Sequence, residues 1–322
     1  MSLKNLKSIL SLLMLIALIL VPAQMALAQD GDEPEATEEP EEGDEVVALE
    51  VDETLGTEDN PIILLFIPSE DAQEVATSAE DLAALITEET DLVFETLVSS
   101  DFAAAIEAMC SGEAQIGALN TFGYILAHQR GCADVGVVSV RFGSAYYAGQ
   151  IITLADAGIE SYEDLAGTVF CRPDPLSTSG WIIPSIALQA NGVDLEGMEI
   201  VDAGGHDGVV TAVYNGECDA GATFEDARST VEETYPDVMD KVVVIDVSAP
   251  IPNDTLSYSP MLSEDARTAI TEALVAIAAD EANLELLGAV YDWSGLEPAE
   301  DAFFDDFREQ LDAAGVDIED LN

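Results

Sequence analysis

Short apolar segments alternate with amphipathic ones from Pro61 onward, and this alternation constrains the fold more than any other feature. Four apolar segments predict buried strands, at residues 62–67, 92–97, 115–119 and 135–140. Segments with helical periodicity separate them, at residues 78–88, 101–110 and 124–129. Strands that alternate with helices in this way predict an α/β fold, with mostly parallel sheets flanked by helices.

A weak internal echo indicates two units of similar construction. Residues 104–118 predict a helix, a Gly-Glu stop at Gly112-Glu113 and a short strand of small residues. Residues 209–222 repeat this order around Gly216-Glu217. We interpret the echo as two lobes; chance recurrence of common α/β patterns is the alternative.

The N-terminus has the features of a secretory signal peptide. Lys4 and Lys7 precede an apolar run over residues 9–21, and Ala26-Leu27-Ala28 supplies a cleavage site. The run is shorter than the about 20 residues that a membrane anchor needs. We therefore predict that residues 1–28 are a signal peptide and that the protein is secreted across the cytoplasmic membrane, into the periplasmic or cell-surface space.

The chain is strongly acidic. Its formal net charge is −56, and loss of Lys4 and Lys7 with the signal peptide would make it more negative. This charge excludes nucleic acid and anionic membranes as partners and points to a saline milieu. Residues 29–60 are rich in Asp and Glu and lack aromatic residues, so we predict an acidic disordered linker there. A partner-binding role for the linker is the alternative.

Four cysteines in an exported chain suggest two disulfides. Cys110 and Cys132 bracket one strand–helix unit, and Cys171 and Cys218 bracket another. We favour these two pairs over the other two connectivities, because each bridge then stays within one lobe. A zinc site is the alternative, but no CxxC spacing is present and we expect no metal.

A run of hydroxyl residues predicts a site for an anion. Ser177-Thr178-Ser179-Gly180 lies between the strand-like segment 168–171 and the helix-like segment 182–190. The first N–H groups of a helix lack intrahelical partners and carry partial positive charge. Hydroxyl groups add donors there, and Gly180 would let a ligand approach the backbone. A serine N-cap on an ordinary helix explains only one of these hydroxyls.

Four motifs in one order resemble a known family. Residues 68–71 (PSED) follow the first strand, residues 116–120 (IGALN) precede a helix, and residues 177–180 (STSG) follow a strand and a proline. Residues 205–207 (GHD) then precede another helix. Together they resemble the phosphate, phosphite and phosphonate substrate-binding proteins of ABC importers, a branch of the type 2 periplasmic binding proteins.

The resemblance implies a two-lobed fold joined by two crossover strands, with the ligand held between the lobes. We assign residues 61–150 to lobe one, 151–254 to lobe two, and 255–322 to a return to lobe one that ends in helices. We expect hinges near residues 148–153 and 251–257. Closure on the anion would precede docking on an ABC permease in the membrane. No cofactor is implied, and we expect a monomer.

The predicted ligand contacts come from both lobes. Ser177, Thr178 and Ser179 are expected to donate to the anion, together with His206 at the start of the next helix. A capping or solvated role is the alternative for His206. The remaining predicted contacts follow strands of lobe one: Ser69, Asn120, Thr121 and Tyr124. Core packing is the alternative for Tyr124.

Three charged residues near these motifs are ambiguous. Asp207 and Glu225 would contact a ligand amine if the ligand has one; otherwise Asp207 caps a helix and Glu225 is solvated. Arg172 lies close to the hydroxyl run. It would serve the anion or would pair with Asp174 or another acid.

No enzymatic motif is present. The sequence has no GxSxG, HExxH, Walker or GxGxxG pattern, and only His128 and His206 are available as bases. We therefore predict a binding protein with no catalytic residues. A binding protein for another small organic solute, or a secreted adhesion or scaffold protein, is the alternative.

Overall fold

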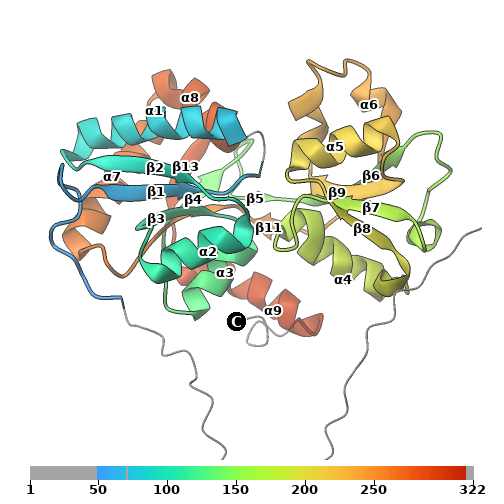
Figure 1. The fold of residues 1–322 in the computed structure, drawn as a ribbon, viewed down its shortest axis with the longest axis horizontal. Coiled ribbons are helices and arrows are strands. Elements are labelled where there is room, and N and C mark those ends of the chain that lie inside the picture. The colour runs from blue at the N-terminus through green and yellow to red at the C-terminus, as the bar shows by residue number, and fades with distance from the viewer. Residues whose placement is uncertain (1–48, 70–71, 317–322) are drawn as a thin grey trace, which may run out of the picture. The chain divides into compact units, whose positions relative to one another are not determined.

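The computed structural model describes residues 49–69 and 72–316 and has two α/β lobes, each built on its own sheet (Figure 1). The predicted signal peptide and most of the predicted linker lie outside the described residues. Within the described ranges, no helix is long and apolar enough to cross a membrane.

Lobe one contains the six-stranded sheet. Its strands are β1 (Ile62–Phe66), β2 (Phe94–Val98), β3 (Ile116–Leu119), β4 (Asp134–Val140), β12 (Thr255–Tyr258) and β13 (Gly295–Pro298). Their spatial order is β13-β4-β12-β3-β1-β2. Strands β1 to β4 run in one direction, and β12 and β13 run in the other.

Lobe two contains the five-stranded sheet. Its strands are β6 (Gly149–Leu154), β7 (Val169–Arg172), β8 (Glu199–Asp202), β9 (Ala220–Phe224) and β10 (Val242–Val247). Their order is β10-β6-β9-β7-β8, and only β6 runs against the others. Both sheets are therefore mostly parallel, as the alternation of strands and helices predicts.

Helices cover both faces of each sheet (Figure 1). Those of lobe one are α1 (Ala72–Thr90), α2 (Phe102–Ser111), α3 (Thr121–Gln129), α7 (Glu264–Ala279), α8 (Leu284–Tyr291) and α9 (Asp305–Ala313). Those of lobe two are α4 (Ile183–Ala190), α5 (His206–Asn215) and α6 (Val238–Lys241). Branched and aromatic side chains of the strands are buried beneath these helices.

Two segments connect the lobes. They pair as the short strands β5 (Tyr146–Tyr147) and β11 (Ile251–Pro252). Next to this pair, Gly149 and Ser248 exchange two hydrogen bonds, from Ser248 N to Gly149 O and from Gly149 N to Ser248 Oγ. Gly149 is the first residue of β6 in lobe two, whereas the boundary predicted from the sequence places residues up to 150 in lobe one.

The end of the expected linker is not disordered. Residues 49–60 pack on lobe one: Asp52 N donates to Met261 O at 2.9 Å, and Leu55 packs against the core. Thr57 and Asn60 close a turn with hydrogen bonds of 3.2 and 3.1 Å. The predicted end of the linker at residue 60 is therefore wrong. Apolar residues near the end of this acidic segment, such as Leu55, pack on the core of lobe one and order the chain there.

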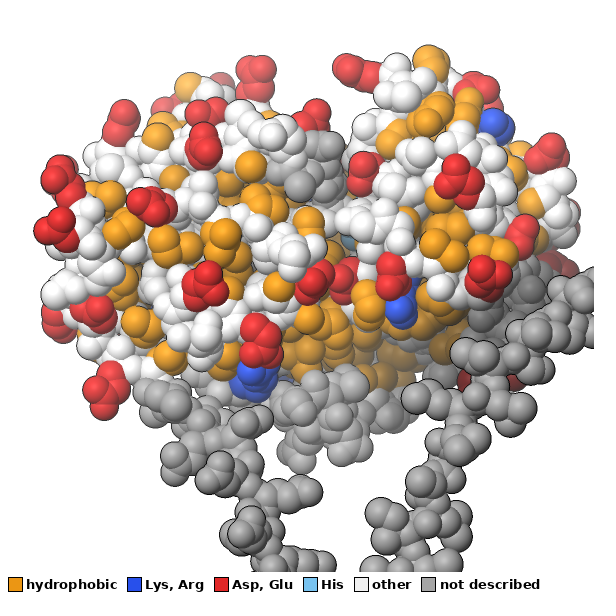
Figure 2. All heavy atoms as spheres, in the orientation of Figure 1, with side chains coloured by type: hydrophobic (Ala, Val, Ile, Leu, Met, Phe, Trp, Pro, Cys, Tyr) orange, Lys and Arg blue, Asp and Glu red, His pale blue; other side chains and the backbone are white. Residues whose placement is uncertain are grey.

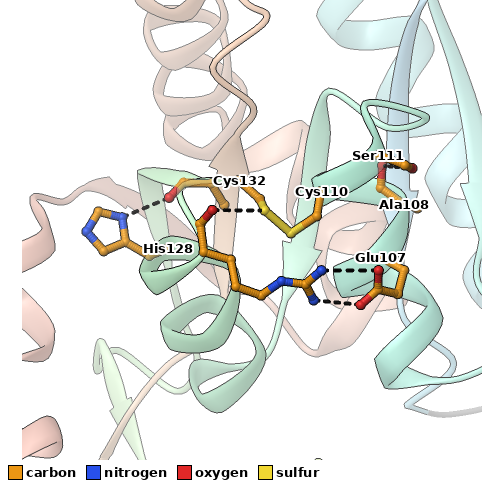
Figure 3. Close-up of a disulfide and its surroundings, with 8 residues drawn as sticks. Glu107, Ala108, Cys110, Ser111, His128 and Cys132 are labelled. Carbon is orange, nitrogen blue, oxygen red and sulfur yellow. Dashed lines mark hydrogen bonds and ion pairs between the residues drawn. A yellow bond between two sulfur atoms is a disulfide. The ribbon is translucent and has the colours of Figure 1, made fainter. Parts of the chain in front are cut away.

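The cysteines form the two favoured pairs, Cys110–Cys132 and Cys171–Cys218, and the described residues include no free cysteine. Each bridge stays within one lobe. The first joins the end of α2 to the loop after α3 (Figure 3). Arg130 of that loop also forms an ion pair with Glu107 of α2 at 2.6 Å, so a disulfide and an ion pair both connect α2 to the end of α3.

Candidate functional site

Several strands end around one small cavity between the lobes. The carboxyl edge of an open α/β sheet is where such folds hold their ligands. The cavity is lined by Ile67, Ser69, Phe102, Asn120, Arg141, Tyr147, Ser177, Thr178, Ser179, His206, Phe224 and Asp254. About 20 Å³ of the cavity is open to the centre of a water molecule. One water needs roughly 10–15 Å³ by that measure, so the closed cavity has room for about one water.

The hydroxyl run starts a helical turn that leads into α4. Ser177 is the N-cap, and its Oγ accepts a hydrogen bond from Gly180 N at 3.2 Å. Among the described residues, the backbone N–H groups of Thr178 and Ser179 have no protein acceptor. Ser177, Thr178 and Ser179 are all buried. Two unpaired N–H donors at a helix start therefore border the cavity, as the sequence predicts.

Gly180 has a different role from the one expected. A Cβ at this position would lie 2.3 Å from Pro173 Cδ. The glycine therefore lets the helical turn pack on Pro173. Gly180 is not among the residues that line the cavity.

The hydrogen bonds of the Thr178 hydroxyl fix the direction of its proton. Its Oγ1 accepts from Asn120 Nδ2 at 2.8 Å and from Phe122 N at 3.0 Å. A hydroxyl has two acceptor lone pairs and one donor proton. Both lone pairs of Oγ1 therefore accept hydrogen bonds from lobe one. The hydroxyl proton has no acceptor among the described residues, and Thr178 lines the cavity, so this proton is available to a ligand there.

Direct hydrogen bonds between the lobes hold the cleft closed. Asn120 Nδ2 also donates to Leu176 O at 2.9 Å, so both of its amide hydrogens go to lobe two. On the other side of the cavity, His206 N donates to Ser69 O at 2.9 Å. Asn120 was expected to contact the ligand, but its amide donors are occupied by protein.

His206 is a neutral donor with a defined tautomer. The backbone N–H of Phe224 can only donate, and it points at His206 Nδ1 from 3.3 Å. Nδ1 is therefore an acceptor, Thr223 Oγ1 donates to it at 2.8 Å, and the ring proton is on Nε2. Burial, and secondarily the charge of Arg141, lowers the pKa of His206 to about 3. Nε2–H lies 3.5 Å from Ser177 Oγ, at the wall of the cavity.

Arg141 is the cation of the cavity, although it is not among the residues predicted from the sequence. The residue is 6 % exposed, and its guanidinium carbon lies 4.6 Å from the centre of the Phe224 ring. Its side chain makes one hydrogen bond within the described residues, to Asp292 Oδ2 at 3.4 Å. Most of its donors are therefore available. Arg141 directly follows the predicted strand 135–140, so the rule that located Ser69 and Asn120 would have located it too.

Asp254 and Tyr147 were also missed. Asp254 directly precedes β12, which runs against its neighbours, so the amino end of β12 lies at the edge where the parallel strands have their carboxyl ends. Tyr147 lies in a connecting segment. Burial raises the pKa of Asp254 to about 6, against the opposing effect of Arg141. Neither position follows a predicted strand, so no sequence signal marked them.

A family model for the periplasmic substrate-binding proteins of phosphonate ABC transporters matches residues 64–304. The chain belongs to this family. The phosphate-import protein PhnD of Mycolicibacterium smegmatis is 31% identical over 176 residues, which are 51% of this chain and 55% of the relative. The chain therefore matches about half the length of this curated relative.

Solved structures of the family share the fold. A binding-protein component of an ABC phosphonate transporter from Pseudomonas aeruginosa superposes with a TM-score of 0.72 at 21% identity, covering 79% of this chain and 86% of that one. PhnD1 from Prochlorococcus marinus, in complex with methylphosphonate, superposes with a TM-score of 0.70 at 11% identity, covering 80% and 98%.

Four residues predicted as contacts do not line the cavity: Tyr124, Thr121, Asp207 and Glu225. Tyr124 points into lobe one, where its OH donates to Asp301 at 2.7 Å and its ring packs on Phe304 at 4.6 Å. Thr121 donates to Pro252 O at 2.6 Å in the connecting segment. Asp207 lies in the first turn of α5, which Gly205 caps, and does not reach the cavity. Helix geometry turns the first three of these side chains away from the strand edge.

Glu225 lies in a second, adjoining cavity. This outer cavity shares Arg141, Tyr147 and Phe224 with the first and adds Phe142, Ser144, Tyr146 and Glu225; about 180 Å³ of it is open to the centre of a water molecule. Arg172, in contrast, bonds to Asp202 at 2.6 Å and stacks over Trp181 at 4.5 Å. Arg172 is therefore paired with an acid other than Asp174, as the alternative to anion binding predicted.

Proposed function

We propose that this protein is the extracytoplasmic solute-binding protein of an ABC importer and that it captures a phosphate, phosphite or phosphonate anion between its lobes. The observation that carries the proposal is the convergence of donors on one small cavity. Thr178 and Ser179 supply backbone N–H groups, Thr178 its hydroxyl, His206 its Nε2–H and Arg141 a positive charge. Such donors suit a compact tetrahedral oxyanion.

Closure of the two lobes would couple capture to delivery. Donors come from both lobes, so one anion meets all of them only in the closed form, and binding therefore favours closure. The paired segments β5 and β11 are the proposed hinge. The closed complex would then dock on a membrane permease.

The same geometry argues against catalysis. Within the described residues, Ser177 and His206 are the serine and histidine whose side chains approach each other at the cavity, with 3.5 Å between Oγ and Nε2. Nε2 carries the ring proton, so it cannot take a proton from the serine. No acid orients the other nitrogen, which accepts from Phe224 N and Thr223 Oγ1. In the described part of the chain, no cluster of three His, Cys, Asp or Glu residues could hold a metal.

Isothermal titration calorimetry with a panel of anions tests the proposal. The full chain, freed of bound ligand by unfolding and refolding, would be titrated with inorganic phosphate, phosphite, methylphosphonate, aminoethylphosphonate and the non-phosphorus control acetate. We expect at least one phosphorus oxyanion to bind in the micromolar range or tighter and acetate not to bind. Ligand at a hundredfold over its Kd should also stabilise the fold by about 2.7 kcal/mol. Absence of binding by every phosphorus oxyanion would leave another small solute, or a scaffold role, as the better account.

A further inference from the structure

An exposed aromatic pair borders the outer cavity. Among the large apolar side chains that are exposed in the described residues, two are aromatic: Phe142, which is 72 % exposed, and Tyr146, which is 44 % exposed. Both line the outer cavity. The ring of Tyr146 packs on Phe303, with 5.0 Å between the ring centres. Aromatic side chains are enriched where proteins bind one another, so this pair marks a candidate contact surface.

Phe142 is also held in a strained backbone conformation. It lies in a tight turn that Arg141 N closes by donating to Ser144 O at 2.9 Å, and Ser144 N by donating to Arg141 O at 3.0 Å. The two central residues, Phe142 and Gly143, have φ of 51° and 77°. Such turns usually carry Asn-Gly, because a bulky side chain is unfavourable at positive φ. Folding therefore gives no reason for phenylalanine here, and strain of this kind is concentrated at functional sites.

The outer cavity is shared by the two lobes. Phe142 follows β4 of lobe one, and Glu225 follows β9 of lobe two. A partner that covers this cavity therefore touches both lobes, and its fit depends on their closure. Phe142 also directly follows Arg141, the cation of the anion cavity. A partner bound here would thus lie beside the anion and would distinguish the closed form from the open one.

The charges at the rim of the outer cavity favour a basic partner. Glu225 lines the cavity, and the exposed Asp226 is the next residue. Asp292, which bonds to Arg141, adds a third carboxylate. Acidic side chains are spread over both lobes on the face in Figure 2, so acidity alone does not mark this surface and the aromatic pair does. A partner must nevertheless carry positive charge where it meets a chain of net charge −56.

We propose that Phe142 and Tyr146, flanked by Glu225 and Asp226, form the surface on which the membrane permease docks. The phenyl ring of Phe142 enters an apolar recess of the permease that basic residues surround. The proposal rests on the proposed function and adds which surface delivers the anion. If the outer cavity instead held an organic part of the ligand, Phe142 would contribute to ligand affinity, so the two roles are separable by experiment.

Uptake of radiolabelled phosphate tests the proposal, in the source organism with its own gene deleted and the variants supplied in trans. Phe142→Asn places the favoured residue in the turn, so the melting temperature should be unchanged or raised. Calorimetry should give a Kd for phosphate within about twofold of the parent, because no ligand contact is lost. Loss of an aromatic anchor weakens an interface by roughly thirtyfold or more, so uptake at saturating phosphate should fall at least about tenfold. Raising the level of the variant should restore part of the uptake, because docking follows mass action.

Matched controls separate this surface from the rest of the molecule. Met239 on α6 is 38 % exposed and does not line the outer cavity, so Met239→Asn should leave both uptake and Kd unchanged. Asp226→Asn removes a rim charge at a φ of 69° that asparagine tolerates, and uptake should fall about two- to fivefold. Asp91→Asn, at a φ of 57° at the end of α1, should have no effect.

The proposal is overturned if Phe142→Asn supports uptake as the parent does. It is also overturned if that variant loses uptake only through a weaker Kd for phosphate, because Phe142 would then serve the ligand. Equal uptake by Asp226→Asn and Asp91→Asn would overturn the basic character of the partner. A parent that restores no uptake of phosphate or methylphosphonate would instead refute the proposed function.

Discussion

Replacing Arg141 with methionine is expected to weaken binding of phosphate or methylphosphonate by about a hundredfold to a few thousandfold. Methionine keeps much of the side-chain length but leaves the bound anion beside Asp254 without a compensating cation. Removing one member of a buried charge pair costs about 3–5 kcal/mol, and about 1.4 kcal/mol corresponds to a tenfold change in Kd. Lysine keeps the charge but not the planar fork, so Arg141→Lys should lose roughly tenfold.

Arg172→Met is the control for this variant. Arg172 is the last residue of β7 and lies near the hydroxyl run in the sequence, but it is paired with Asp202 and stacked on Trp181. Calorimetry should find that Arg172→Met binds the anion within about twofold of the parent, because Arg172 does not line the cavity. Loss of its ion pair with Asp202 should also cost little stability, since exposed ion pairs contribute little to folding. Circular dichroism should confirm that Arg141→Met is folded. If the folded variant has the same Kd for the anion as the parent, the anion does not bind at Arg141.

Replacing Thr178 with valine should have the second-largest effect, a loss of affinity of roughly a hundredfold or more. The hydroxyl acts on both sides of the cleft: it accepts from Asn120 and Phe122 of lobe one and donates into the cavity. Valine removes a donor to a charged ligand, worth about 1.5–3 kcal/mol, and leaves two buried lobe-one donors unpaired in the closed form. Thr178→Ser keeps the hydroxyl and should stay within a few fold of the parent.

Thr153→Val separates this effect from a general loss of stability. Thr153 is equally buried, but its Oγ1 donates to Asp219 O within lobe two, away from the cavity. This control should lower the melting temperature without changing Kd, whereas Thr178→Val should change Kd. If Thr178→Val has a lower melting temperature but the same Kd as the parent, Thr178 stabilises the start of the helix and does not contact the ligand.

The fold followed from local patterns in the sequence. Apolar runs of strand length, separated by helical periodicity, located β1, β2, β3 and β4 within about two residues at each end. Burial explains this success, because helices cover both sheets and the central strands beneath them are therefore mostly apolar. The edge strands β2 and β8 are less buried and carry exposed acidic residues. The end of the expected linker was misjudged, because the contact between Asp52 and Met261 joins residues far apart in the sequence.

The site was predictable only where it follows a strand. Ser69, Ser177, Thr178, Ser179 and His206 were all placed at the cavity because each lies after a predicted strand or at the start of the next helix. Tyr124 failed because its position along α3 turns it into the core.

Arg141 and Asp254 show what local patterns leave out. Arg141 obeyed the same rule but was overlooked beside the more conspicuous hydroxyl run. Asp254 precedes an antiparallel strand, and its place at the cavity depends on the order of strands in the sheet. That order is set by long-range pairing of β12 with β3 and β4, which no local pattern specifies.

A crystal structure of the full mature chain grown with inorganic phosphate tests the central claim most directly. The account predicts one phosphate in the cavity between the lobes, within hydrogen-bonding distance of Thr178 Oγ1, His206 Nε2 and Arg141, with one oxygen facing Asp254. The cross-lobe bond from Asn120 to Thr178 should be present in the same crystal. Phosphate bound outside this cavity, or a closed cavity that holds only water at saturating phosphate, would contradict the account.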